Sequence, residues 1–249
     1  MSLVEVNKVS RHFSTGPFVV KALDDVNITI GEGEFTAMVG PSGSGKTTLL
    51  NQIGGLDRPD AGSIFIAGTE ITDLNRKQLT DLRLWKIGFV FQEYNLISVL
   101  TALENVEYVM TLQGVGVRER RERAQAVLRQ VGLEQEGGRR PNELSGGQQQ
   151  RVAVARAIVS NPAIVLADEP TANLDSKTGS DLLKLMRSLN IEQGITFLFS
   201  THDPMVMERA TRIIQLKDGR IASDLQDTEL QQWRRSTQGA ANDATTRTS

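Results

Sequence analysis

The feature that most constrains the fold is a glycine-rich stretch at residues 40–47, which reads GPSGSGKT. It follows a short apolar run, Phe35–Val39, and precedes apolar residues at helical spacing. A strand, a glycine loop and a helix in this order form a phosphate-binding unit, because the glycines let successive backbone N–H groups turn toward an anion and the helix adds its positive end. The chain is therefore expected to have an α/β core that binds a nucleotide.

Two side chains in this stretch have chemistry of their own. Lys46 is expected to reach the β and γ phosphates, and Thr47 to offer its hydroxyl to Mg²⁺, which neutralises phosphate charge. The plain alternative is an ordinary glycine-rich turn, and the order of elements around the loop argues against it. The candidate nucleotide ligands in this part of the chain are Gly40, Pro41, Ser42, Gly43, Ser44, Gly45, Lys46, Thr47 and Thr48.

Other apolar patterns predict the rest of the sheet. Ile164–Ala167 and Ile195–Phe199 are short, continuous apolar runs typical of buried parallel strands, and residues 178–189 between them have helical spacing. Apolar and polar residues alternate over Leu3–Val9 and Val26–Ile30, which indicates antiparallel strands. The expected fold class is α/β, with a P-loop NTPase core, a mixed or parallel sheet and an N-terminal antiparallel β-subdomain.

The middle of the chain is expected to be a helical insertion. No strand pattern stands out between residues 101 and 160, and four apolar residues share one face of a predicted helix. These four residues are Ala124, Val127, Leu128 and Val131. We place this helical subdomain at about residues 93–160, inside one nucleotide-binding domain over residues 3–223. A hairpin over residues 213–222 is expected to close the sheet.

The C-terminal end is expected to lie outside this domain. Residues 224–235 are interpreted as a helical extension, and residues 236–249 as a disordered polar tail.

Composition excludes several classes of function. Absence of cysteine removes disulfides and thiolate chemistry, and two histidines disfavour a histidine-rich metal site. The 28 basic and 30 acidic residues give a net charge of −2, which argues against a nucleic-acid partner. No apolar run approaches the roughly 18 to 20 residues of a membrane span, and no secretory signal is evident. We expect the chain to stay in the cytoplasm.

Two adjacent acids follow the second predicted buried strand. Asp168 is expected to hold the Mg²⁺ shell together with Thr47, while Glu169, pointing the other way by strand alternation, could deprotonate the water that attacks the γ phosphate. A solvated acidic turn is the plain alternative. With the phosphate loop in the same chain, the pair indicates ATP hydrolysis rather than transfer to a second substrate.

A second candidate anion site begins at residues 144–148, which read LSGGQ. Ser145 and two glycines open a predicted helix, whose N-terminus can also bind phosphate. With the phosphate loop and the acid pair, this motif resembles the signature loop of the ATPase subunits of ATP-binding cassette (ABC) transporters. The resemblance covers residues 3–223 and implies a head-to-tail dimer around two MgATP. The signature-loop ligands that it implies are Ser145, Gly146, Gly147 and Gln148.

Four further residues match motifs of this family. The resemblance implies that Gln92 contacts Mg²⁺ or the attacking water, that His202 hydrogen-bonds the γ phosphate, and that Asp175 lies in the loop crossing the dimer interface. Phe13 stands where an aromatic side chain stacks on adenine, although tyrosine is more usual there. The family's glycine before the asparagine of the interface loop is Ala172 here. The plain alternatives are an exposed glutamine, a structural histidine and a core phenylalanine.

Within the family, three stretches are similar to the lipoprotein-releasing and macrolide-exporting group. They are residues 40–51, residues 91–96 with 100–106, and residues 167–175. That similarity implies a second nucleotide-binding subunit, most simply an identical chain, and a separate FtsX-like permease with a large extracytoplasmic domain. The chain is then expected at the cytoplasmic face of the inner membrane as a peripheral subunit. A soluble, non-transport ABC ATPase acting on a macromolecular partner is the alternative function.

The segment from Tyr94 to Asn105 is the candidate contact with such a permease. It has more apolar residues than a free loop normally shows, and we expect it to line a groove for a short cytoplasmic helix. Packing of the same residues within the helical insertion is the alternative. Two other classes, a nucleotide kinase and a non-hydrolysing binding module, are disfavoured by Glu169 and the signature loop.

Overall fold

The computed structural model describes residues 2–16, 18–226 and 228–234, and its centre is a six-stranded sheet. The strands pair in parallel from β9 through β3, β8 and β7 to β6, and β10 pairs antiparallel with β9 at one edge. In the order of the sheet the strands are β10 (Arg220–Gln226), β9 (Arg212–Lys217), β3 (Phe35–Val39), β8 (Thr196–Ser200), β7 (Ile164–Asp168) and β6 (Ile87–Val90). The carboxyl ends of the parallel strands meet at one edge, where ligands bind in α/β sheets.

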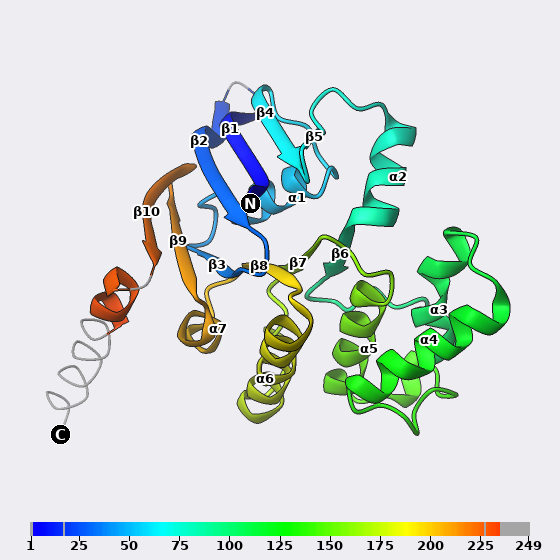
Figure 1. Cartoon of the computed structure of the whole chain (residues 1–249). Helices are drawn as coiled ribbons and strands as arrows, with labels where there is room; N and C mark the ends of the chain where they lie inside the picture. The colour runs from blue at the N-terminus through cyan, green and yellow to red at the C-terminus, as the bar shows by residue number, and fades with distance from the viewer. Residues whose placement is uncertain (1, 17, 227, 235–249) are drawn as a thin grey trace, which may run out of the picture.

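A second, four-stranded antiparallel sheet forms the N-terminal layer. Its strands, in order, are β2 (Phe18–Gly31), β1 (Ser2–Thr15), β4 (Ala61–Ile66) and β5 (Thr69–Glu70). Figure 1 shows β1, β2 and β4 as a separate layer above the central strands. The expected mixed sheet and antiparallel β-subdomain are both confirmed.

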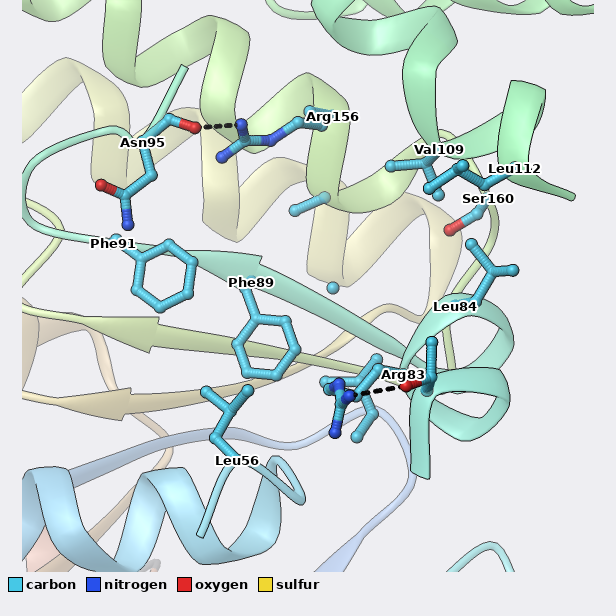
Figure 2. A pocket seen from close by; sticks show the side chains of 14 residues that line it. Leu56, Arg83, Leu84, Phe89, Phe91, Asn95, Val109, Leu112, Arg156 and Ser160 are labelled. Carbon is cyan, nitrogen blue, oxygen red and sulfur yellow. Dashed lines mark hydrogen bonds between the residues drawn. The ribbon is translucent and has the colours of Figure 1, made fainter. Parts of the chain in front are cut away.

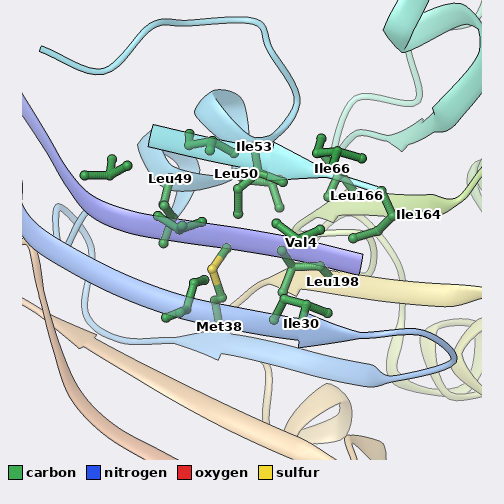
Figure 3. Close-up of a cluster of buried hydrophobic side chains, with 14 of the residues drawn as sticks. Val4, Ile30, Met38, Leu49, Leu50, Ile53, Ile66, Ile164, Leu166 and Leu198 are labelled. Carbon is green, nitrogen blue, oxygen red and sulfur yellow. The ribbon is translucent and has the colours of Figure 1, made fainter. Parts of the chain in front are cut away.

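Helix α1 (Lys46–Ile53) lies between the two sheets, and its apolar residues join them in one core. In Figure 3, Leu49, Leu50 and Ile53 of α1 point among side chains from both sheets, including Val4 and Leu166. Because the N-terminus of α1 directly follows residues 40–45, burial of the helix fixes the phosphate loop against the sheet.

The opposite face of the central sheet is covered by α6 (Ser176–Gln193) and α7 (Pro204–Arg209). The aromatic rings of Phe35 and Phe199 pack there with their centroids 4.7 Å apart. A sheet that is apolar on both faces explains why its strands are continuous apolar runs in the sequence.

The helical insertion lies beyond β6 and is coloured green in Figure 1. It has its own apolar core, and no strand interrupts it between residues 101 and 160, all of which the structure describes. Its buried residues include Ala124, Leu128 and Val131, as their helical spacing predicts. The insertion contains α3 (Ala102–Leu112), α4 (Val117–Gln130), a short 3-10 helix (Pro141–Glu143) and α5 (Gly146–Ile158).

Some elements differ from the expectations. Strand β10 continues to pair with β9 as far as Gln226, opposite Arg212, so the helical extension expected over 224–235 is wrong in its first three residues. Residues 228–234 are helical, and the expected polar tail lies outside the described residues. Strand β4, strand β6 and helix α2 (Arg76–Lys86) were not predicted. Among the helices that the structure describes, none has the length and apolar character to cross a bilayer.

Candidate functional site

The phosphate loop connects β3 to α1, and two of its glycines combine a positive φ with a close approach to a neighbouring backbone. Gly40 has φ 153° and Gly45 has φ 105°. A Cβ at Gly40 would lie 2.2 Å from the carbonyl oxygen of Leu216, and a Cβ at Gly45 would lie 2.4 Å from that of Ala22. Both approaches are to backbone atoms, which cannot move aside as a side chain would. The glycine spacing therefore reflects close packing of the loop against the neighbouring strands.

Lys46 is folded onto this loop. Its Nζ donates to the carbonyl oxygens of Gly40 (2.8 Å) and Pro41 (3.1 Å), and the residue is 8% exposed. Helix α1 has no acidic residue in its first turn, so its positive end is not neutralised by its own side chains. The buried Ser44 hydroxyl has no hydrogen-bond partner in the described structure. Cationic, hydroxyl and backbone donors thus converge where an anion would bind.

Thr47 and Asp168, two of the expected metal ligands, are in contact although they belong to different elements. The Thr47 hydroxyl donates to Oδ1 of Asp168 at 3.2 Å, joining the start of α1 to the end of β7. Hydroxyl and carboxylate oxygens are hard donors of the kind that Mg²⁺ prefers, so these residues fit the ion.

Gln92 has a different position in the structure. It follows β6, next to β7 in the sheet, and is exposed. Its backbone carbonyl accepts a hydrogen bond from the Asn173 amide at 3.0 Å, but within the described residues the Gln92 side chain makes no hydrogen bond to Thr47 or Asp168. The topology brings Gln92 to the same edge of the sheet without placing its side chain on the expected metal ligands.

The Glu169 carboxylate is held between two groups from the loop after β8. His202 Nδ1 lies 2.6 Å from Glu169 Oε1, and the Thr201 hydroxyl donates to Oε2 at 2.9 Å. Glu169 lies just beyond β7 with φ 43°, so a left-handed backbone sets its direction, not the strand alternation expected from the sequence. The Glu169 side chain is 17% exposed and that of His202 is 74% exposed. The carboxylate can accept a proton from a group that approaches from the solvent side.

The signature loop forms the start of α5. The Ser145 hydroxyl accepts the backbone N–H of Gln148, and the Gln148 side chain accepts the N–H of Ser145, a capping box. A Cβ at Gly147 would lie 2.3 Å from Thr178 Cγ2, and one at Gly146 would lie 2.9 Å from the Tyr94 hydroxyl. The two glycines therefore allow the loop to pack against α6 and the segment after Gln92.

Asp175 caps the N-terminus of α6 beside this loop. Its carboxylate accepts the N–H groups of Lys177 and Thr178 and the Thr178 hydroxyl, the last at 2.6 Å. These hydrogen bonds, led by that of the Thr178 hydroxyl, lower the pKa of Asp175. Asp175 thus orders the start of α6, and in the described chain these hydrogen bonds stay within that helix.

The phosphate loop and the signature loop have different neighbours. The first packs on Ala22 and Leu216, and the second on Tyr94 and Thr178. The N-termini of α1 and α5 in the described chain therefore pack on different parts of the fold.

A family model described as ABC transporter matches residues 23–172, more than half of the 249 residues. The matched range includes the phosphate loop, the signature loop and the acid pair. The chain belongs to the ABC transporter family. As an ABC transporter ATPase subunit it binds ATP, with Mg²⁺ as cofactor, and hydrolyses it.

Three similar proteins indicate which ABC transporter proteins this subunit resembles. The lipoprotein-releasing system ATP-binding protein LolD of Anaeromyxobacter dehalogenans is 48% identical over 89% of this chain and 93% of LolD. The macrolide export ATP-binding/permease protein MacB of Hyphomonas neptunium is 47% identical over 89% of this chain, which spans 34% of MacB. The dimeric post-hydrolysis structure of the cassette MJ0796 of Methanocaldococcus jannaschii, bound to ADP and Pi, has a TM-score of 0.83 at 47% identity, covering 90% of this chain and 98% of MJ0796. These similarities do not support a non-transport ABC ATPase.

Several residues that organise this ABC transporter site were missed from the sequence. Thr201 fixes Glu169, and the buried Gln150 on α5 donates to the carbonyl oxygens of Phe91 (3.3 Å) and Pro170 (2.8 Å). Gln150 thereby connects the signature helix to the loops of Gln92 and Glu169. Its position two residues after the signature motif was the available signal, but its partners are 59 and 20 residues away in the chain.

Arg156 makes a similar connection six residues further along α5. Its guanidinium donates to the carbonyl oxygens of Tyr94 (2.9 Å) and Asn95 (2.5 Å), two residues that both have positive φ. Arg156 thus holds the left-handed turn that follows Gln92. Nothing in the local sequence indicated this role.

Proposed function

We propose that two copies of this chain close head to tail around two MgATP, with the phosphate loop of one copy facing the signature loop of the other. The observation that carries this proposal is that the two loops of a single chain pack on different neighbours and not on each other's glycines. The dimeric arrangement of the related cassette MJ0796 supports it. ATP binds the closed pair better than the open one, and this difference in affinity is what drives closure.

We propose these roles for the site residues. Lys46 leaves the loop carbonyls to bind the phosphates, and Thr47 and Asp168 hold Mg²⁺, whose charge offsets that of the phosphates. Glu169 takes a proton from the attacking water, while Thr201 orients the carboxylate. His202, released from Glu169, binds the γ phosphate.

The remaining assignments concern the ends of the site. Gln92 contacts the metal or the water once the pair has closed, and Asp175 lies at the dimer interface. Phe13 stacks on the adenine.

We also propose that the dimer drives an FtsX-like membrane permease in lipoprotein release or macrolide export. The names of LolD and MacB support this assignment, because MacB combines an ATP-binding part with a permease. The subunit then lies at the cytoplasmic face of the inner membrane as a peripheral protein.

A cavity of about 540 Å³ between the central sheet and the insertion is the proposed permease site. Figure 2 shows the rings of Phe89 and Phe91 side by side on its wall, and their planes differ by 2°. Leu56, Leu84 and Leu112 contribute more apolar surface. An amphipathic helix can bury its apolar face in such a groove.

The residues that form this cavity differ from those expected. Of the segment from 94 to 105, only Asn95 lines it, whereas Leu96 packs against the core of the insertion. Asn105 is buried and binds backbone groups of Ile97, Leu100 and Thr101, so it orders the segment from within. Much of this segment therefore packs within the insertion, which was the alternative expectation.

A substitution in this cavity should weaken permease binding without changing the rate of ATP hydrolysis. Leu112 is 58% exposed, so Leu112→Asp is expected to leave the fold and the phosphate release of the purified protein unchanged. A charge buried in the groove costs several kcal/mol, and recovery of the membrane partner should fall at least about tenfold. The measurement is quantitative mass spectrometry of membrane proteins that co-purify from the native cells.

Ile191→Asp is the matched control, because Ile191 is 67% exposed on α6, away from the cavity. It should retain the partner. Equal recovery with both variants would show that the permease binds elsewhere.

A further inference from the structure

Phe13 stands in β1 with a cation over its ring. The guanidinium carbon of Arg11 lies 4.7 Å from the ring centroid, within the range of cation–π contacts. The Phe13 side chain remains 41% exposed, so much of the ring is open to a ligand.

Arg11 is itself held by two carboxylates. Its Nε and Nη2 donate to the two oxygens of Asp57 at 2.9 and 3.0 Å, and its Nη1 donates to Asp60 at 2.7 Å. Asp60 is fixed in turn, because it accepts the backbone N–H of His12 and its own N–H donates to Ser10. The His12 amide is the main cause of the lowered pKa of Asp60, which keeps this carboxylate ionised. A planar guanidinium bound at both ends in this way has little rotational freedom.

The two carboxylates belong to the segment that follows α1. Because α1 begins at the phosphate loop, Arg11 connects the strand that contains Phe13 to the far end of the phosphate-binding helix. The ring and the phosphate loop are thereby held in one geometry, although β1 and α1 belong to different parts of the chain.

We propose that Arg11 is a positioning residue for the nucleobase: it fixes the Phe13 ring from one face so that adenine stacks on the open face. This inference rests on the proposed role of Phe13. A ring that is already oriented loses less conformational freedom when the base binds, so the benefit appears as affinity for the base rather than for the phosphates.

The test compares a ligand that has a base with one that lacks it. Binding of MgADP and of inorganic pyrophosphate to the full chain is measured by calorimetry for the wild type, Arg11→Ala and Arg11→Lys. Arg11→Ala should weaken MgADP binding about two- to fivefold, the effect expected of one cation–π contact, and leave pyrophosphate binding unchanged. Arg11→Lys keeps the charge but not the two-point contact with Asp57, so its affinity should be intermediate. Arg118→Ala, a 92% exposed arginine with its own ion pair on α4, is the control.

A double variant decides whether Arg11 acts through the ring. Phe13→Ala alone should weaken MgADP binding about tenfold, and adding Arg11→Ala should then have no further effect. Three results would overturn the proposal. Arg11→Ala could weaken MgADP and pyrophosphate binding equally, or it could bind MgADP more tightly than the wild type. Arg11→Ala could also weaken MgADP binding as much in the Phe13→Ala background as in the wild type. If Phe13→Ala itself leaves MgADP affinity unchanged, the role of Phe13 in base stacking fails, and the inference about Arg11 fails with it.

Discussion

Glu169→Gln is expected to reduce steady-state ATP hydrolysis at least about 100-fold while ATP still binds, since a positioned general base contributes about 10² to 10⁴. The amide has nearly the shape of the carboxylate, so it can keep the contact with Thr201 (2.9 Å in the wild type). It cannot take the proton of the attacking water. The closed pair should therefore form and persist, because the step that opens it is blocked.

Phosphate release and size-exclusion chromatography with MgATP measure the two halves of this prediction. The variant should elute as a dimer with ATP and as a monomer without it. Glu208→Gln, a 67% exposed glutamate on α7, is the control and should hydrolyse ATP normally. Hydrolysis by Glu169→Gln at the wild-type rate would show that another group acts as the base.

Lys46→Ala is expected to weaken nucleotide binding, MgADP included, about ten- to 100-fold, the effect of losing hydrogen bonds to a charged group. Among the described residues Nζ donates hydrogen bonds only to the carbonyls of Gly40 and Pro41, so the ammonium is available to a phosphate. Truncation removes the positive charge and shortens a buried side chain at the start of α1, where alanine is favourable for the helix.

Calorimetry with MgADP and a thermal unfolding curve test this prediction together. Lys184→Ala is the control, because Lys184 lies on α6 and pairs with Asp181 at the surface. The melting temperature of Lys46→Ala without nucleotide should stay near that of the wild type. Unchanged nucleotide affinity in a folded Lys46→Ala protein would contradict the role of the lysine.

The sequence predicted the parts of the site whose residues are consecutive in the chain. The phosphate loop, the Asp168 and Glu169 pair and the signature loop each lie between regular elements whose apolar patterns are clear. The unpredicted strand β6 has only four residues, Ile87–Val90, too few to show a pattern of their own. Helix α2 has a single buried residue, Leu79, so its apolar face is weak in the sequence.

The contacts that organise the site could not be predicted, because they join distant residues. Thr201 meets Glu169 across 32 positions, and Arg156 meets Tyr94 across 62. Arg11 is 46 residues from Asp57. From the sequence alone, each of these polar side chains is indistinguishable from an ordinary surface residue, because its partner comes close only in the folded chain. The direction of Glu169 also depends on one left-handed residue, which strand alternation does not describe.

The central claim is that two chains are needed to complete one ATPase site, and the concentration dependence of phosphate release tests it most directly. Release from saturating MgATP is measured for the wild-type protein from nanomolar to tens of micromolar chain. We expect the rate per chain to rise with protein concentration and then reach a plateau as the pairs become saturated, and release to stop without Mg²⁺. A rate per chain that is constant over the whole range, or no release at any concentration, would contradict the claim.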